Sequence, residues 1–136
     1  MNTPETWDAR SETRQTLDKI KQYREYLKIP EVTITQKTPE GSEVTEEIRI
    51  RDISIQGIGG YATSRYQKGD RLRVTLKLVL PENNVVEEAL TAEVRWATLV
   101  DQGKRYAFGL RFSEVEKKNP VVYTYLKKLE EKFMLA

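Results

Sequence analysis

The residues best suited to chemistry lie together in one short segment of the chain. Residues 51–60 read Arg-Asp-Ile-Ser-Ile-Gln-Gly-Ile-Gly-Gly, which brings Asp52, Ser54 and Gly57 close together. A carboxylate accepts two hydrogen bonds side by side from one planar partner, and a hydroxyl can donate or accept beside it. Glycine lets a backbone approach a ligand closely and adopt positive φ. The segment is therefore typical of a strand end that holds a polar ligand with N–H donors, such as the edge of a guanine base.

The composition argues against catalysis. The 136 residues include no Cys and no His, so the chain lacks a thiolate nucleophile, the commonest general base and the commonest metal ligands. We therefore expect no enzymatic activity, no metal and no cofactor. The net charge of +2 is too small for general nucleic-acid binding, so neither DNA nor RNA is an expected partner. The start of the chain lacks an apolar signal region, no segment is long enough to span a bilayer, and a cytoplasmic location is expected.

The elements that must position this segment are mostly strands. The clearest one covers residues 72–80, where Leu and Val alternate with polar residues in the pattern of a half-buried strand. Turn residues separate it from its neighbours. Six strands are predicted, over residues 32–36, 43–55, 61–66, 72–80, 86–100 and 106–112. Short strands with regular turns indicate a mainly β fold, an antiparallel barrel that is closed or nearly closed.

A helix is expected on each side of the strands. The first covers about residues 4–28, because Pro30 disfavours helical geometry in the residue before it. The second begins at Asn119 and Pro120, which suit the cap and the first helical position. Its apolar stripe consists of Val122, Leu126, Leu129 and Phe133. We expect one domain overall, with an N-terminal helix over residues 1–30, a barrel over 31–116 and a C-terminal helix over 117–136 packed on the barrel.

Three parts of the sequence resemble the PilZ domain family, the bacterial receptors for cyclic di-GMP. Asp52, Ser54 and Gly57 match the D-x-S-x-x-G signature of that family. The segments 92–96 (Ala-Glu-Val-Arg-Trp) and 106–112 (Tyr-Ala-Phe-Gly-Leu-Arg-Phe) resemble its closing strands, in the same order and at similar spacing. The resemblance implies a six-stranded antiparallel PilZ-like β-barrel with flanking N-terminal and C-terminal α-helices.

The resemblance covers about residues 24–115 and implies a second motif, R-x-x-x-R, just before the first strand. Arg24 and Lys28 occupy that position, with lysine in place of the second arginine. Lysine keeps the charge, but it lacks the planar fork that binds phosphate and stacks on bases. Arg10 and Arg14 match the motif in letters but lie inside the predicted first helix. We take Arg24 and Lys28 as the first choice for a cationic clamp on the ligand, and Arg10 and Arg14 as the second.

The resemblance implies a receptor that binds cyclic di-GMP and passes the signal to a protein effector that controls motility, pili, biofilm or virulence. Asp52 and Ser54 would read a guanine edge, and Gly57 would permit close approach of the backbone. The alternative is a PilZ-like adaptor that does not bind the nucleotide and acts through protein–protein contacts. A homo-oligomer through the helices stays open. Trp96 is interpreted as a residue of the core or the barrel wall.

Overall fold

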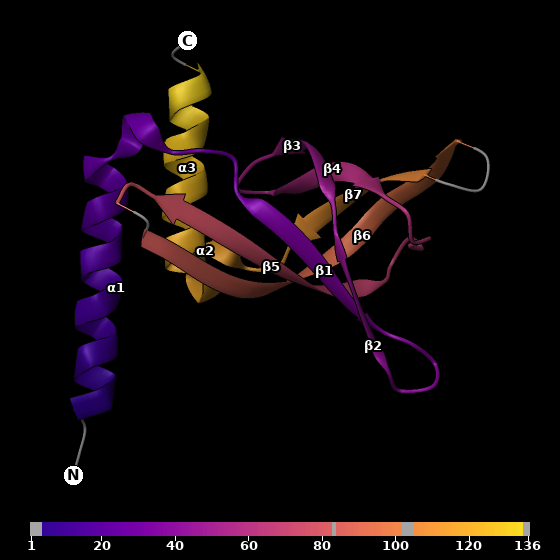
Figure 1. Ribbon diagram of the computed structural model, residues 1–136, viewed down its shortest axis with the longest axis horizontal. Coiled ribbons are helices and arrows are strands. Elements are labelled where there is room, and N and C mark those ends of the chain that lie inside the picture. Colours follow the sequence, from indigo (N-terminus) through magenta and orange to yellow (C-terminus); the bar gives the residue numbers. More distant parts are fainter. Residues whose placement is uncertain (1–3, 83, 102–104, 135–136) are drawn as a thin grey trace.

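The computed structural model describes residues 4–82, 84–101 and 105–134. Within these ranges, seven strands form one antiparallel sheet in the order β2-β1-β5-β6-β7-β4-β3 (Figure 1). The strands are β1 (Glu31–Lys37), β2 (Glu43–Glu47), β3 (Arg49–Ile53), β4 (Gly57–Ala62), β5 (Arg71–Leu80), β6 (Asn84–Asp101) and β7 (Arg105–Phe112). The helices are α1 (Pro4–Gln22), the short 3₁₀ helix η1 (Arg24–Tyr26), α2 (Val115–Lys118) and α3 (Pro120–Met134).

The sheet curls because two consecutive strands occupy its opposite edges. β2 pairs with β1, β3 pairs with β4, and Ile48 alone joins them. The Ile48 side chain is buried, and its backbone N–H donates a hydrogen bond to the carbonyl of Val32 at 3.1 Å. The prediction of one strand over 43–55 and of six strands in all was therefore wrong. The chain crosses from one sheet edge to the other at Ile48, and the result is a seven-stranded curled half-barrel.

The strand after the glycine segment begins earlier than predicted. β4 starts at Gly57 and ends at Ala62, whereas the sequence placed a strand over 61–66 with the glycines in a loop before it. It pairs along its length with β7 and, with one irregularity, with β3. Positive φ among the described glycines occurs at Gly41 and Gly69. The glycines of β4 therefore serve close packing between strands.

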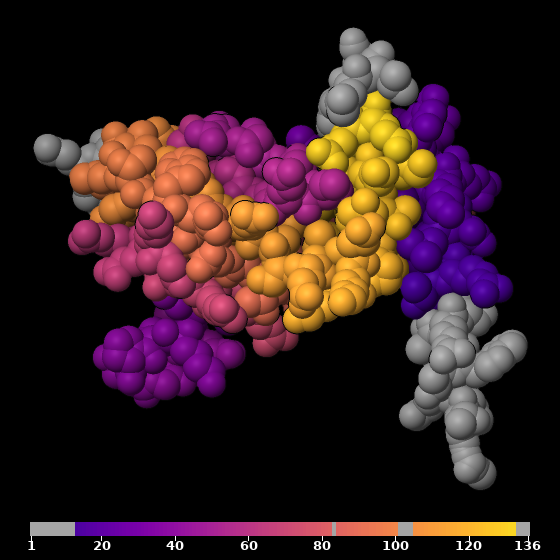
Figure 2. Space-filling model, turned by 180° about the vertical axis from the view of Figure 1, so that it is seen from behind, coloured from indigo at the N-terminus to yellow at the C-terminus, as the bar shows by residue number. Residues whose placement is uncertain are grey.

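The two long helices lie side by side at one end of the sheet, with α3 between the sheet and α1 (Figures 1 and 2). The first helix ends at Gln22, earlier than the predicted residue 28, because the chain then forms η1 and is extended at Leu27 (φ −67°, ψ 139°). The start of the second helix at Pro120 confirms the prediction. The short helix α2, just before it, was not predicted.

The core lies between the concave face of the sheet and α3. On β5 every second residue is buried, as the alternation predicted; these residues are Leu72, Val74, Leu76, Leu78 and Leu80. Val122, Leu126 and Leu129 of α3 are also buried and confirm three positions of the predicted stripe. The Phe133 side chain lies outside the described residues. Burial of such side chains stabilises the fold by about 1.5–3 kcal/mol each.

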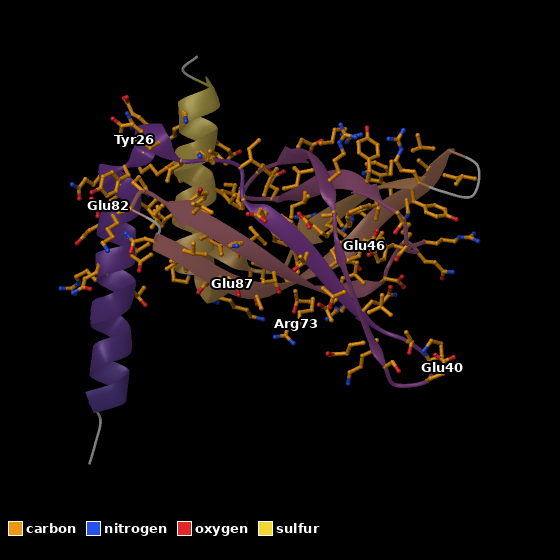
Figure 3. All side chains as sticks on the ribbon, viewed as in Figure 1. Tyr26, Glu40, Glu46, Arg73, Glu82 and Glu87 are labelled. Carbon is orange, nitrogen blue, oxygen red and sulfur yellow. The ribbon has the colours of Figure 1, made fainter. Side chains whose placement is uncertain are left out.

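The carboxylate of Glu46 ties the β2 edge to the loop after β4 (Figure 3). It accepts hydrogen bonds from the hydroxyl of Thr63 at 2.6 Å, the backbone N–H of Ser64 at 3.2 Å and the hydroxyl of Tyr66 at 3.1 Å. Burial raises the pKa of Glu46, but the hydrogen bonds from Thr63 and Ser64 outweigh it and leave the pKa below the usual value. The ionised carboxylate is thus the form that closes this edge.

Candidate functional site

One row of residues crosses four neighbouring strands and defines the site. Asp52 on β3 pairs with Gly59 on β4, Gly59 pairs with Gly109 on β7, and Gly109 pairs with Trp96 on β6. Adjacent strands lie about 4.8 Å apart, so the backbones of Asp52 and Trp96 stand roughly 14 Å apart. Phe108 precedes Gly109 on β7 and is buried in the core, so Gly109 faces the other side of the sheet. The row therefore lies on the face of the sheet opposite to the core, with a carboxylate and an indole on either side of two glycines.

The two glycines of the row leave the space that the flanking side chains occupy. A Cβ at Gly59 would lie 2.7 Å and 2.8 Å from the two carboxylate oxygens of Asp52. A Cβ at Gly109 would collide with the indole nitrogen of Trp96. Asp52 and Trp96 therefore lie down over the two glycines, and we call the space above these two side chains the slot.

Two β-bulges aim arginines at this slot. The β3–β4 register shifts between Ile50 and Asp52, which leaves Arg51 as the extra residue. The β6–β7 register shifts between Val94 and Trp96, which leaves Arg95 as the extra residue. A bulge re-aims side chains and breaks the alternation of a strand. For this reason Arg51 and Asp52 are both exposed on β3, as are Arg95 and Trp96 on β6.

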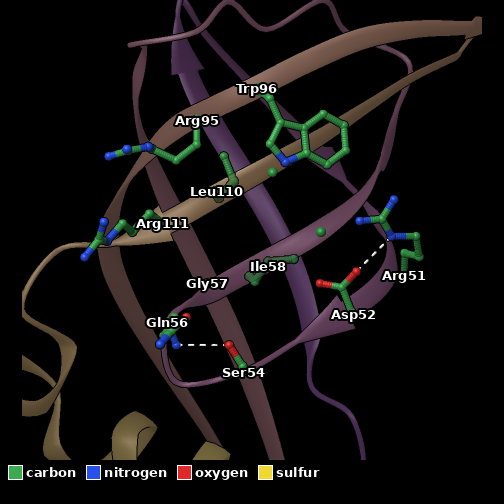
Figure 4. A pocket seen from close by; sticks show the side chains of 12 residues that line it. Arg51, Asp52, Ser54, Gln56, Gly57, Ile58, Arg95, Trp96, Leu110 and Arg111 are labelled. Carbon is green, nitrogen blue, oxygen red and sulfur yellow. Dashed lines mark hydrogen bonds and ion pairs between the residues drawn. The ribbon is translucent and has the colours of Figure 1, made fainter.

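The slot is part of a pocket of about 350 Å³ whose lining comes from β3, β4, β6, β7 and the turn after β3 (Figure 4). The predicted residues Asp52, Ser54 and Gly57 all line it. Gln56 and Arg111 line it as well, and the sequence had not singled them out. The pocket thus combines a carboxylate, a hydroxyl, an amide, arginines and one indole.

Asp52 is already engaged by a neighbour. Arg51 Nε lies 2.8 Å from Asp52 Oδ2, and the Asp52 side chain is 63% exposed. The Arg51 guanidinium also lies 5.5 Å from the centre of the Trp96 ring, within cation–π distance. The hydrogen bond to Asp52 and its charge raise the pKa of Arg51 above its usual value. Arg51 therefore occupies one side of the carboxylate with N–H donors, as a ligand would.

Ser54 shapes the turn between β3 and β4. Its hydroxyl accepts a hydrogen bond from the backbone N–H of Gln56 at 3.1 Å, and its own N–H donates to the carbonyl of Gly57 at 2.9 Å. The carbonyl of Gln56 accepts from the N–H of Phe112 at 2.9 Å, which ties the turn to β7. The hydroxyl of Ser54 still has a proton to donate toward the pocket.

The predicted cationic clamp does not lie in this pocket. Arg24 and Lys28 are absent from its lining and lie against α3 instead. The Arg24 guanidinium lies 3.8 Å from the carboxylate of Glu131. The Tyr125 hydroxyl donates to the carbonyl of Lys28 at 2.7 Å and accepts from its N–H at 3.3 Å. The C-terminal helix thus holds the segment of residues 24–28, which we call the linker.

The second-choice clamp is also distant from the pocket lining. Arg14 is an exposed residue of α1 and does not line the pocket. Arg10 belongs to α1, and its side chain lies outside the described residues. The structure therefore brings together the three D-x-S-x-x-G residues and leaves Arg24 and the backbone of Lys28 on α3.

The interpretation of Trp96 as a core or barrel-wall residue needs correction. The Trp96 side chain is 39% exposed, and it forms one wall of the pocket. Strict alternation places residues 94 and 96 on one face of the strand and therefore predicts that Trp96 is buried. The unusual length of β6 is a signal of a bulge, and a bulge at residue 95 would have predicted an exposed Trp96.

The described residues contain no group of acidic side chains that could hold a metal ion. The helices of the described ranges include none with the length and apolar character required to cross a bilayer.

The chain thus combines a curled antiparallel β-sheet with a polar, arginine-bearing pocket on its outer face. The sequence profile of the PilZ domain matches residues 18–127, and the chain belongs to this family. PilZ domains are in general receptors or adaptors without catalytic activity.

The solved structure of one protein shows the same fold at low sequence identity. The chain is similar to the inhibitor of motility MotI/DgrA of Bacillus subtilis, with 18% identity, a TM-score of 0.56 and coverage of 79% of this chain and 48% of that one. It therefore spans about half the length of MotI/DgrA. It also resembles the PilZ domain of Escherichia coli YcgR with c-di-GMP, with 17% identity, a TM-score of 0.46 and coverage of 78% and 86%. No curated protein sequence matches the chain.

Proposed function

We propose that this protein is a receptor for cyclic di-GMP that transmits binding to a partner protein in the bacterial cytoplasm. The observation that carries the proposal is the cross-strand row in which Asp52 and Trp96 face each other over Gly59 and Gly109. A purine is flat and presents N–H donors at its edge. The carboxylate suits the donors of a guanine, and the indole suits its face.

Each part of the nucleotide has a matching group in this proposal. Asp52 and Ser54 read the guanine edge, Trp96 stacks on a base, and Gly57 keeps the turn close to β7. Arg24 and Lys28 reach the phosphates when the linker leaves α3. Arg10 and Arg14 remain the alternative clamp. No bond is made or broken, so the receptor needs neither a catalytic group nor a cofactor.

The linker connects ligand binding in the pocket with the surface of the helices that a partner protein would contact. Residues 31–116 would hold the bases, and residues 1–30 and 117–136 would carry the signal once Arg24 and Lys28 reach the phosphates. The hydroxyl of the buried Tyr125, the ammonium of Lys132 and the carboxylate of Glu131 all hold the linker on α3. Recruitment of Arg24 by the ligand must break its ion pair with Glu131. The ligand would then shift the population of linker positions and change the surface that the helices present.

Isothermal titration with cyclic di-GMP at physiological salt, with GMP as the control, tests the proposal. Saturable binding with a Kd at or below about 1 μM, or about −8 kcal/mol, is expected, and GMP should bind far more weakly. The ratio of ligand to protein also separates one nucleotide per site from a stacked pair. The absence of binding heat and of any change in melting temperature would contradict the receptor.

The ion pair between Arg24 and Glu131 gives a second prediction. Glu131→Gln releases Arg24 for the ligand, so it is expected to tighten cyclic di-GMP binding by roughly 2–5-fold, the scale of one exposed ion pair. Glu130→Gln removes the same charge one position away and serves as the matched control. Titration of both variants measures the effect. Equal affinity of the two would argue that Arg24 does not leave α3 upon binding.

One observation favours the adaptor as a second candidate. The Arg24 guanidinium pairs with Glu131, Tyr125 holds the backbone of Lys28, and lysine replaces the second arginine of the motif. A chain that never releases the linker would keep the barrel and use its helices for a protein partner or a second copy. Failure of the titration, with the fold intact, would favour this function.

A further inference from the structure

The pocket holds more positive charge than recognition of a base requires. Arg51 stands at one end beside Asp52, and Arg95 and Arg111 stand at the opposite end (Figure 4). The pocket lining therefore carries three guanidinium groups and one carboxylate. Because Arg51 and Asp52 form an ion pair with each other, the excess charge lies at the end of Arg95 and Arg111.

Neighbouring strands bring these two arginines together. Arg95 is the extra residue of the β6 bulge, between the partners of Leu110 and Gly109. Arg111 pairs with Gly57 on one side and with Glu93 on the other. Both arginines are exposed, and Figure 4 shows both guanidinium groups on the same side of the pocket. Without the bulge, Arg95 and Trp96 would point to opposite faces of the sheet.

The charges around this pair are incompletely balanced. Glu93 Oε1 lies 3.3 Å from Arg95 Nη1, and the two side chains are 42% and 51% exposed. Such a pair is worth less than about 1 kcal/mol in water. Among the residues that the structure describes, no carboxylate lies within ion-pair distance of Arg111. Glu93 therefore serves Arg95 alone, and Arg111 has no carboxylate partner among the described residues.

The spacing from the base slot also suits a phosphate. Arg111 lies two residues from Gly109 along β7, about 7 Å at the rise of a strand. This is the scale that separates a base from its own phosphate in a nucleotide. Guanidinium groups bind phosphate oxygens through forked, charge-assisted hydrogen bonds.

We infer that Arg95 and Arg111 form a phosphate-binding site at one end of the pocket. This site holds one phosphodiester of the ligand while the linker is still on α3. The inference rests on the proposed function for the identity of the ligand. In this inference the arginines of the sheet bind the ligand first. Arg24 and Lys28 then bind it from the linker, and this movement of the linker carries the signal to the helices. Glu93 competes with the phosphate for Arg95.

Titration calorimetry with two probes tests this inference. Cyclic di-GMP and inorganic pyrophosphate are titrated into the wild type and into Arg95→Gln, Arg111→Gln and Glu93→Gln. Each arginine variant is expected to weaken cyclic di-GMP binding by about 10-fold, the loss of one charge-assisted hydrogen bond at an exposed site. Glu93→Gln is expected to tighten binding by roughly 2–5-fold, because it frees Arg95. Pyrophosphate should follow the same order at lower affinity.

Arg73→Gln is the matched control, because Arg73 is an exposed strand arginine of β5 outside this pocket. It should bind as the wild type does, and thermal melting should show that all variants fold. If the wild type binds cyclic di-GMP and both arginine variants bind equally well, the inference is overturned and the receptor stands. Binding of pyrophosphate alone, lost in Arg111→Gln, supports the phosphate site and rejects the receptor. Binding of neither probe rejects both.

Discussion

Asp52→Ala is expected to weaken cyclic di-GMP binding at least about 100-fold while the domain stays folded. The carboxylate would accept two N–H bonds from one guanine edge, and a hydrogen bond to a charged group is worth about 1.5–3 kcal/mol. The loss of two such bonds corresponds to a factor of roughly 100 or more in Kd. The fold should persist because the Asp52 side chain is largely exposed, and its pair with Arg51 is a surface ion pair.

Glu87→Ala is the control for this prediction, since Glu87 is an exposed acidic residue elsewhere on β6 (Figure 3). Titration calorimetry and thermal melting of both variants measure affinity and stability separately. Retained affinity in Asp52→Ala would exclude the carboxylate as the base reader. A large drop in melting temperature would instead give Asp52 a structural role.

Side-chain periodicity could predict the part of the fold that buries apolar surface on one face. The alternation over residues 72–80 placed β5 within one residue of its observed start, because each buried Leu or Val must face the same side. Asn119 and Pro120 located the start of α3 for an equally local reason. These signals depend on neighbours in the sequence, so the sequence alone carries them.

Features that depend on contacts between residues distant in the sequence leave no local pattern, so the sequence did not predict them. The continuous polar–apolar pattern around Ile48 gives no sign that the chain changes partner strands there, from β1 to β4. The same holds for the linker, because its position depends on Tyr125, 97 residues away from Lys28. Proximity to the first strand predicted Arg24 and Lys28 as part of the site, but α3 holds them in another place.

The sequence predicted the residues of one wall of the pocket and missed those of the opposite wall. The D-x-S-x-x-G letters identified Asp52 and Ser54, both of which line the pocket. The opposite wall, with Arg95 and Trp96, depends on a bulge that leaves no periodic signal. A carboxylate and an indole become one site only through the two glycines between them, and these glycines come from strands far apart in the sequence.

Gly57→Ala and Gly59→Ala are expected to separate folding from binding. A Cβ at Gly57 would fall on the carbonyl oxygen of Leu110, which belongs to the backbone of β7. The β4–β7 ladder must open to admit it, so Gly57→Ala should cost about 3 kcal/mol, the upper end for overpacking. This cost should lower the melting temperature by roughly 10 °C. Thermal melting followed by circular dichroism measures it.

Gly59→Ala should give the opposite result. Its Cβ would lie 2.7–3.0 Å from the tips of Asp52 and Arg51, which are flexible ends of exposed side chains and can move. The melting temperature should therefore stay within a few degrees of the wild type, while displacement of the Asp52 carboxylate weakens cyclic di-GMP binding at least about 10-fold. A stable Gly57→Ala without affinity would show that Gly57 serves the ligand. An unstable Gly59→Ala would show that the absence of a side chain at this position is needed for the sheet itself.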